Sequence, residues 1–101
     1  MARILKIWVD DLRPRPDDTW YVAKSSYFAI ILLKVAKRHG LSVRAISLDH
    51  DLGGDDTTRP VVMWMAENKF WPETVYVHTA NPVGRSWIEG TVNQYGPGVS
   101  R

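Results

Sequence analysis

Apolar residues along the chain gather in short runs, separated by polar loops and by segments of helical spacing. The run Arg3–Val9 is nearly continuous and apolar, which is typical of a strand covered on both faces. Leu41–Leu48 and Thr74–His78 are predicted to form two more long strands. Thr19–Ala23 has the composition of a short strand, whereas the prolines of Leu12–Asp18 exclude a helix there.

A helix is predicted between the short strand and the second long one. Ser25 or Ser26 offers an N-cap, and Gly40 provides the stop at the other end. Apolar residues between them recur at i, i+3, i+4, i+7 and i+8, which predicts one buried face. That face would comprise Phe28, Ile31, Leu32, Val35 and Ala36.

A second helix is predicted to begin at Thr58, which would act as its N-cap. Its early Pro60 suits the first turn, because the missing N–H would be unpaired there anyway. The helix is expected to end before Phe70–Pro72. Its inward face would comprise Val61, Trp64, Met65 and Asn68.

The last helix is predicted to follow Asn81, a good N-cap, with Pro82 as its first residue. It would run to about Tyr95, although Gly84 and Gly90 lower its intrinsic helix propensity. Its inward face would comprise Trp87, Ile88, Thr91, Val92 and Tyr95.

Strands that alternate with helices predict an α/β fold with a mainly parallel sheet. Right-handed crossovers favour a compact three-layer sandwich around a four-stranded sheet in the order 2-1-3-4, with only a tail from Gly96 onward. A chain of 101 residues has the size of one domain. Residues 1–101 are therefore predicted to form a single domain.

Composition narrows the class of protein without identifying an activity. With 45% hydrophobic and 24% charged residues, the chain has the proportions of a soluble globular domain, so disorder is not expected. A net charge of +2 spread along the chain gives no strong indication of nucleic-acid binding. No apolar run reaches membrane-spanning length, and the N-terminus lacks a signal-peptide pattern. We therefore expect a cytoplasmic protein without a membrane partner, either a monomer or a small homo-oligomer.

The segment Ser47–Gly54 departs from the apolar pattern at the end of a predicted strand. Asp49, His50 and Asp51 follow one another directly after Leu48. Charged groups are tolerated in a core only when they are paired or bound to metal, so the segment is predicted to open onto a functional site. The alternative is an acidic loop tip in solvent, and the segment alone does not decide between the two.

Polar residues also follow the other two long strands. Asp10 and Asp11 end the first strand, and His78–Asn81 ends the last. Ligands bind outside the carboxyl ends of parallel strands where the strand order reverses, so these groups are expected to meet. Clustered carboxylates repel one another unless a cation offsets their charge, and carboxylate oxygens suit Mg²⁺. Asp10, Asp11 and Asp49 are therefore predicted to bind Mg²⁺ or another divalent cation.

The remaining polar residues suit a phosphate group. Arg13 flanks the predicted site, and Arg85 lies in the first turn of the last helix, whose N-terminus attracts anions. His50 and His78 are predicted to transfer protons at neutral pH, beside the hydroxyl of Thr79. The predicted ligand is a small phosphorylated molecule, in particular a nucleotide, and the predicted reaction is hydrolysis of a phosphoester.

Asp51 and Asn81 complete the set, as residues expected to contact the substrate. Each candidate also has a purely structural alternative. Asp10–Asp11 can end a strand as turn residues, His78 can hydrogen-bond backbone in the core, and Asn81 is already explained as a helix cap. Asp55–Asp56 are expected to lie in solvent.

The residues Asp10–Asp11, Leu48–Asp49 and Thr79 resemble the response-regulator receiver domain. The resemblance implies a truncated receiver-like or flavodoxin-like fold, a phosphoacceptor Asp49 with two acids that hold Mg²⁺, and a hydroxyl at Thr79 that senses the phosphoryl group. Two features depart from that pattern. The chain lacks room for a fifth strand carrying the receiver's lysine, and a proline–arginine loop replaces the first crossover helix. One alternative function is therefore a non-enzymatic phosphoacceptor or phosphate-binding module.

Three motifs look more closely like a receiver-like family proposed to process cyclic phosphates. They are Trp8–Pro14 (WVDDLRP), Ser47–Gly53 (SLDHDLG) and His78–Gly84 (HTANPVG). The resemblance implies a metal-dependent phosphoesterase that acts on a cyclic or linear phosphate ester. Such compact domains also look like those carried by phages, which implies a role in counteracting nucleotide-signal defence. The remaining alternative is a module that sequesters a nucleotide or contacts a partner protein.

Overall fold

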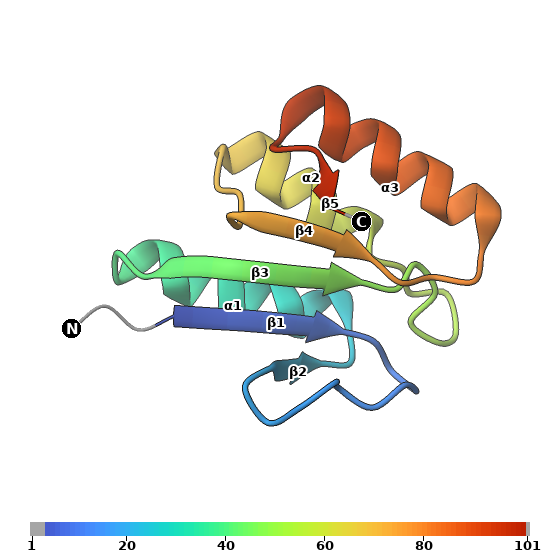
Figure 1. Cartoon of the computed structure of the whole chain (residues 1–101), viewed down its shortest axis with the longest axis horizontal. Coiled ribbons are helices and arrows are strands. Elements are labelled where there is room, and N and C mark those ends of the chain that lie inside the picture. Colours follow the sequence, from blue (N-terminus) through green and yellow to red (C-terminus); the bar gives the residue numbers. More distant parts are fainter. Residues whose placement is uncertain (1–3, 101) are drawn as a thin grey trace.

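The computed structural model describes residues 4–100, which form five strands and three helices (Figure 1). The elements in chain order are β1 (Ile4–Val9), β2 (Tyr21–Ala23), α1 (Ser26–Arg38), β3 (Ser42–Leu48), α2 (Arg59–Asn68), β4 (Thr74–Val77), α3 (Pro82–Tyr95) and β5 (Val99–Ser100). The predicted start of the first strand at Arg3 lies outside the described residues. Every other predicted strand and helix is present, with ends that differ by up to two residues.

The five strands form one parallel sheet in the order β2-β1-β3-β4-β5. The predicted order of the first four strands is confirmed. The prediction of a tail after Gly96, with no room for a fifth strand, is wrong, because Val99 and Ser100 pair with Val75 and Tyr76 of β4. A strand of two residues that follows Gly98 with φ +83° is too short to produce a recognisable apolar pattern.

All three helices pack on one face of the sheet, where α1 passes behind β1 and β3 in Figure 1. The main core contains Leu33 of α1, Met65 of α2 and Ile88 of α3, together with Ile46 and Val75 of the sheet. The molecule therefore has two layers of regular structure, which corrects the expected third layer. The connection from β1 to β2, where a helix could cover the opposite face, is a loop in the described residues.

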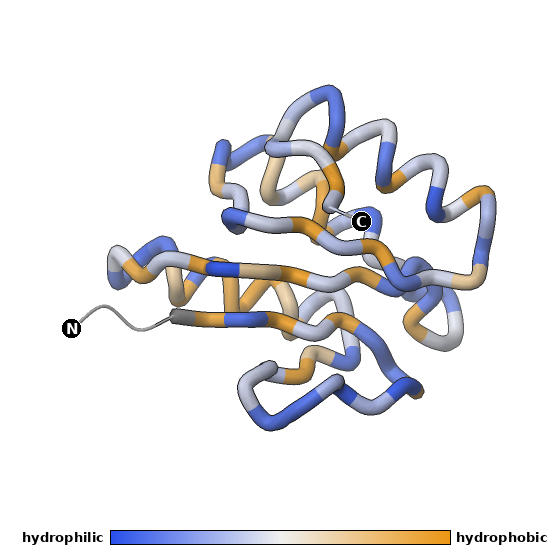
Figure 2. Tube along the Cα trace, in the orientation of Figure 1, coloured by the Kyte–Doolittle hydropathy of each residue, from blue (hydrophilic) through white to orange (hydrophobic). Residues whose placement is uncertain are grey.

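The opposite face of the sheet is covered only in part, by the loop that joins β1 to β2. This loop is mostly hydrophilic in Figure 2, but Trp20 at its end packs on Trp8 with ring centroids 5.9 Å apart. The ammonium group of Lys6 lies 4.7 Å from the Trp20 ring centroid, a favourable cation–π distance. Val22 and Ala45 complete this small second cluster.

The inward face of α1 agrees with the prediction at Ala36 but not at Phe28 or Val35. Ser25, one of the two predicted candidates, is the N-cap, and its Oγ accepts from the N–H of Phe28 at 3.1 Å. However, Phe28 and Val35 are 45% and 46% exposed, so their predicted burial is wrong. The fully buried residues of α1 are Ala29, Leu33 and Ala36.

The other two helices are buried largely as predicted. In α2, Val61 and Met65 are buried, but Thr58 makes no capping bond, and the Thr57 Oγ1 accepts from the N–H of Arg59 instead, at 3.2 Å. Trp64 and Asn68 are half-buried beside them.

In α3, Ile88 and Val92 are buried and Trp87 and Thr91 are half-buried, whereas Tyr95 is 61% exposed. The predicted burial of Tyr95 is therefore wrong, and its side chain lies with Met63, Ala66 and Glu67 of α2 around a surface hollow. No helix within residues 4–100 is long and apolar enough to cross a membrane.

Candidate functional site

Three polar residues lie at the same level along the edge of the sheet, each one position beyond the last residue of a strand. The hydrogen-bond ladder continues through them. The N–H of Asp10 donates to Ala23 O at 3.1 Å, that of Asp49 to Val9 O at 3.0 Å, and that of His78 to Leu48 O at 3.0 Å. The sheet therefore brings together residues from three distant parts of the chain, as expected for the carboxyl edge of a parallel sheet.

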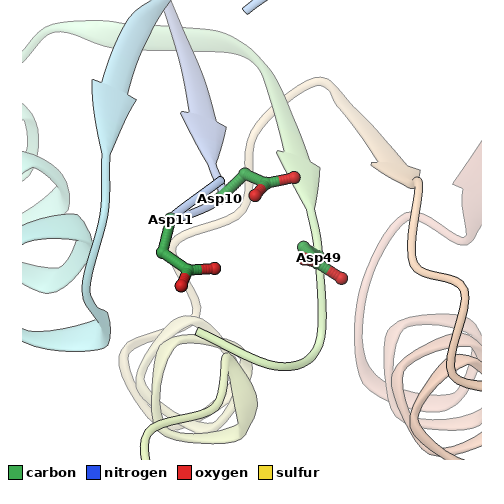
Figure 3. Close-up of side chains that lie close together, drawn as sticks. All are labelled: Asp10, Asp11 and Asp49. Atoms are coloured by element: carbon green, nitrogen blue, oxygen red, sulfur yellow. The ribbon is translucent and has the colours of Figure 1, made fainter. Parts of the chain in front are cut away.

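Three carboxylates form a compact acidic cluster at this edge, which we call the acid trio: Asp10, Asp11 and Asp49. Asp10 and Asp11 follow β1, and Asp49 follows the neighbouring strand β3 (Figure 3). One carboxylate oxygen from each residue lies within 4.8 Å of the others. Two oxygens that share Mg²⁺ at about 2.1 Å can be at most about 4.2 Å apart, so small side-chain rotations suffice. The donor set, three hard oxygens, fits a divalent cation such as Mg²⁺.

Gly53 allows the loop after β3 to approach the acid trio. Its φ of +87° is in the region that favours glycine. A Cβ added there would lie 2.8 Å from the Oδ2 of Asp11. Glycine is therefore favoured here by the backbone conformation, and a side chain would also displace the Asp11 carboxylate, a role that its place in the second motif alone did not reveal.

A cavity of about 380 Å³ opens beside the acid trio. We call it the acidic cavity, and its lining contains Asp10, Asp11, Leu12, Arg13, Asp49, Asp51, Gly53, Thr79, Ala80 and Asn81. Seven of the ten site residues predicted from sequence belong to this lining. His50, His78 and Arg85 do not, although each contacts residues that do.

His78 contacts the acid trio through Asp10, whose side chain is fully buried. The Oδ1 of Asp10 accepts from the N–H groups of Leu12 and Arg13, at 2.8 Å and 3.0 Å. Its Oδ2 lies 2.9 Å from the Nε2 of His78. Burial alone would raise the pKa of Asp10, but these backbone donors and His78 outweigh burial and lower the pKa below its usual value. Asp10 is therefore ionised and can only accept hydrogen bonds.

The position of the proton on His78 follows from its two partners. Because Asp10 only accepts, the Nε2 of His78 carries the hydrogen, and Nδ1 accepts from the Oγ of Ser47 at 2.8 Å. Burial lowers the pKa of His78 despite the nearby carboxylate of Asp10, so the ring is neutral at pH 7. The indole of Trp8 stacks on it at 3.9 Å. Ser47 is a contributor that sequence reasoning missed, because a buried serine in a strand carries no distinguishing pattern.

His50 also has a partner on each ring nitrogen, one of them the carboxylate of Asp51. Its Nε2 accepts from the Nε–H of Arg59 at 3.0 Å, so its Nδ1 carries the hydrogen and donates to Asp51 Oδ1 at 2.9 Å. The Oδ2 of Asp51 accepts from the side-chain amide of Asn81 at 3.0 Å. The hydrogen bond from Asn81, followed by that from His50, lowers the pKa of Asp51. This network joins the loop after β3 to the loop after β4.

Gly84 explains how α3 packs against this network. Asn81 is the N-cap of α3, as predicted, and its Oδ1 accepts from the N–H of Gly84 at 3.0 Å. A Cβ at Gly84 would lie 2.3 Å from the Cγ of His50. The glycine that lowers helix propensity is therefore the residue that lets the first turn of α3 contact the buried imidazole.

The two predicted phosphate-binding arginines lie in different environments. Arg13 lines the acidic cavity, and its guanidinium donates to the backbone oxygen of His78. Arg85 donates to Thr79 O at 3.0 Å and lies 3.4 Å from a carboxylate oxygen of Glu89. Arg85 therefore supports the backbone of the loop after β4, outside the cavity lining.

Asp56 corrects the prediction that Asp55–Asp56 lie in solvent. Asp55 is exposed, but Asp56 is half-buried, and its two carboxylate oxygens accept from the N–H and the Oγ of Ser26, at 2.8 Å and 2.6 Å. Leu52 in the same loop is buried in the main core. The acidic segment is thus fixed to α1 and to the core, which holds Asp49 and Asp51 at the cavity.

Comparison with known proteins identifies one family. The family model described as the cyclic-phosphate processing Receiver domain matches residues 5–94, which include all three sequence motifs. No curated protein and no solved structure matches the chain.

Proposed function

This chain belongs to the cyclic-phosphate processing receiver domain family, and we propose from its geometry that it is a metal-dependent phosphoesterase that opens a cyclic phosphate ester of a nucleotide. The family supports a phosphate-related role. The acid trio carries the finer proposal, because its oxygens lie within 4.8 Å of one another in a cavity that also contains a hydroxyl and a guanidinium. Removal of a nucleotide signal, such as one used in defence against phages, would be a natural use of this activity.

Asp10, Asp11 and Asp49 would hold the divalent cation. Three clustered carboxylates repel one another, so their close approach is favourable only when a cation offsets the charge. Bound there, Mg²⁺ would neutralise phosphoryl oxygens and favour attack by water. The trio lines a cavity whose other residues include the donors Arg13, Thr79 and Asn81 for the remaining phosphate oxygens.

Different cavity residues would bind the phosphate and the attacking water. The hydroxyl of Thr79 and the guanidinium of Arg13 would donate to phosphoryl oxygens, and the ionised Asp51 would accept from the attacking water. The water oxygen forms a bond to phosphorus, and one ester P–O bond breaks. The leaving oxygen takes up a proton that balances the one lost by water, and a phosphate monoester remains.

His50 and His78 would act through the carboxylates that they contact. Each ring donates to an aspartate of the cavity, His50 to Asp51 and His78 to Asp10. Hydrogen bonds of this kind orient carboxylates and tune their basicity in metal sites. We therefore propose both histidines as positioning residues, a narrower role than the proton transfer predicted from sequence.

Substitution of Asp49 by asparagine tests the proposed activity. With adenosine 2′,3′-cyclic phosphate and Mg²⁺, Asp49→Asn should lower kcat/KM at least about a hundredfold, because a developing charge loses its stabilisation. Asp55→Asn is the matched control, since Asp55 is an exposed acid in the same loop outside the cavity lining. Full activity of Asp49→Asn would exclude the proposed role of the trio.

A second candidate is a non-enzymatic phosphoacceptor, which is favoured by the position of Asp49 and Thr79 in one cavity. The strand β5 consists of Val99 and Ser100 and carries no lysine, so the partner that receivers use at that strand is missing from it. Incubation with acetyl phosphate followed by intact-mass measurement discriminates the two: a stable added phosphate supports the acceptor. Nucleotide binding without turnover would instead support sequestration.

A further inference from the structure

A second hollow adjoins the acidic cavity on the side of β2. It has a volume of about 350 Å³, and its lining contains Asp10, Asp11, Leu12, Arg13, Pro14, Arg15, Val22 and Lys24. The residues from Asp10 to Arg13 belong to both linings. A ligand at the acid trio therefore has two directions in which to extend, toward β4 through the acidic cavity or toward β2 through this hollow, which we call the basic hollow.

The two directions differ in charge. The residues that line only the acidic cavity include Asp49 and Asp51 and no cation. Those that line only the basic hollow include Arg15 and Lys24 and no acid. A second anionic group would therefore be repelled by the acidic cavity and attracted by the basic hollow. The cation at the trio would not offset this repulsion, because it would already be needed to hold the reacting phosphate.

Of the two cations that line only the basic hollow, Lys24 has fewer interactions with the rest of the protein. Its side chain is exposed, and its ammonium has no hydrogen-bond or ion-pair partner among residues 4–100. Arg15 is more constrained, because its guanidinium donates to Trp20 O at 3.0 Å. The pKa of Asp17 is lowered, mainly by hydrogen bonds from Thr19 and also by the positive charge of Arg15. Arg15 therefore lies close to an acid. The attraction for an anion is therefore centred on Lys24.

We propose that the basic hollow binds a second anionic group of the substrate, so that the preferred substrate is a nucleoside cyclic phosphate that carries another phosphate. This inference rests on the proposed function for the place of the reacting phosphate. The cyclic phosphate occupies the acid trio, and the second phosphate lies beside Lys24 and Arg15. The nucleoside lies between the two phosphates, in contact with the apolar side chains of Leu12, Pro14 and Val22.

The test compares two nucleotides that differ by one phosphate: adenosine 2′,3′-cyclic phosphate and the same compound with a 5′-phosphate. Equilibrium binding is measured with Mg²⁺, alongside kcat and KM for each compound. The 5′-phosphate should tighten binding about tenfold, as expected for two exposed charge pairs, and high salt should remove most of this gain. Lys24→Ala should reduce the gain about threefold by raising KM, with kcat unchanged.

Lys37→Ala is the matched control, because Lys37 is an exposed lysine of α1 beside a different hollow. It should leave the gain unchanged. Equal affinity for the two nucleotides, no binding of the doubly phosphorylated one, or equal losses in both lysine variants would overturn the inference, even if hydrolysis is fast. A gain that depends on Lys24 without any hydrolysis would support the hollow and reject the proposed phosphoesterase.

Discussion

The negative charge of Asp11 should destabilise the folded chain when no metal is bound. It lies in a cluster with two other carboxylates and against Gly53, so the trio carries repulsion that a divalent cation would convert into attraction. Asparagine has nearly the same shape and no charge. Asp11→Asn should therefore remove repulsion that destabilises the fold without metal and, at the same time, weaken the binding of the cation.

We expect Asp11→Asn to be at least as stable as the original chain in EDTA but to respond less to Mg²⁺. Mg²⁺ at one hundred times its dissociation constant should stabilise the original chain by about 2.7 kcal/mol. Urea unfolding with and without Mg²⁺ measures both effects. An equal Mg²⁺ response in the two proteins would show that the cation binds elsewhere.

His78 should make stability depend on pH in the mildly acidic range. Because burial lowers its pKa, the unfolded chain binds a proton that the folded chain does not, once the pH falls below about 6.5. Stability is therefore complete above that pH and is lost as the pH falls, by at most about 1.4 kcal/mol per unit. Asp10 acts in the same direction but only below the usual aspartate pKa of 3.8.

Unfolding in EDTA at pH 7.5 and pH 5 measures this dependence, with His78→Gln as the comparison. His39 and His50 are present in both proteins, so the difference between their pH responses isolates His78. We expect the variant to lose less stability between the two pH values. Identical losses would mean that His78 titrates as it does in the unfolded chain.

At this scale the sequence predicted which residues meet at the sheet edge better than it predicted their hydrogen-bond partners. The residue types after each long strand placed seven predicted residues around one cavity. The partners of the two imidazoles were not predictable, because Ser47 and Arg59 become neighbours of His78 and His50 only through the sheet register and the fold of a loop. Hydrogen bonds between distant segments leave no local pattern.

Among the elements, α3 contains two glycines with opposite roles. Gly84 faces the His50 ring, whereas nothing lies within 4 Å of a Cβ added at Gly90. Alanine has a higher helix propensity than glycine by about 1 kcal/mol. The same substitution should therefore stabilise the helix at one position and disrupt packing at the other.

We expect Gly90→Ala to raise the free energy of unfolding by about 0.5–1 kcal/mol. Gly84→Ala should lower it by about 1–3 kcal/mol, the usual cost of overpacking a rigid site, and should also displace His50 and weaken nucleotide binding. Urea unfolding of the two variants in parallel is the measurement. A stabilising Gly84→Ala would contradict the close packing on His50.

Element boundaries and faces show where sequence patterns stop being informative. A capping bond is local, and the bonds at Asn81 and at Ser25, one of two candidates, are present, whereas the predicted cap Thr58 makes none. The inward face of α1 was misplaced at Phe28 and Val35 because large apolar residues dominate the pattern, whereas the small Ala29 beside Phe28 is the residue that is buried. Small residues on a packed face contribute little to an apolar pattern, although they decide how closely two layers meet.

For the whole molecule, no residue that lines the acidic cavity comes from beyond the first turn of α3. We therefore expect a chain that ends at Gly96 to keep its Mg²⁺ response while losing about 1–2 kcal/mol of stability, since Val99 no longer packs on the core. Thermal unfolding of the shortened chain with and without Mg²⁺ tests this. Loss of the Mg²⁺ response would show that β5 contributes to the site.

The number of strands and the number of layers are the two global properties that the sequence pattern did not predict. Apolar runs in β1 suggested a strand covered on both faces, and Trp8 is indeed only 9% exposed. However, its cover is the loop residue Trp20 and the ring of His78, not a helix. An apolar strand pattern indicates that both faces are buried, but it does not indicate whether a helix or a loop covers them.

The two outermost strands, β2 and β5, have three and two residues, whereas the central β3 has seven. An exposed outer strand offers unpaired backbone groups on which another molecule can add a strand, and long flat edges therefore promote fibre formation. Here such a junction would span only a few residues at either border. The chain should accordingly resist edge-to-edge aggregation at high concentration, even though one side of its sheet has no helical cover.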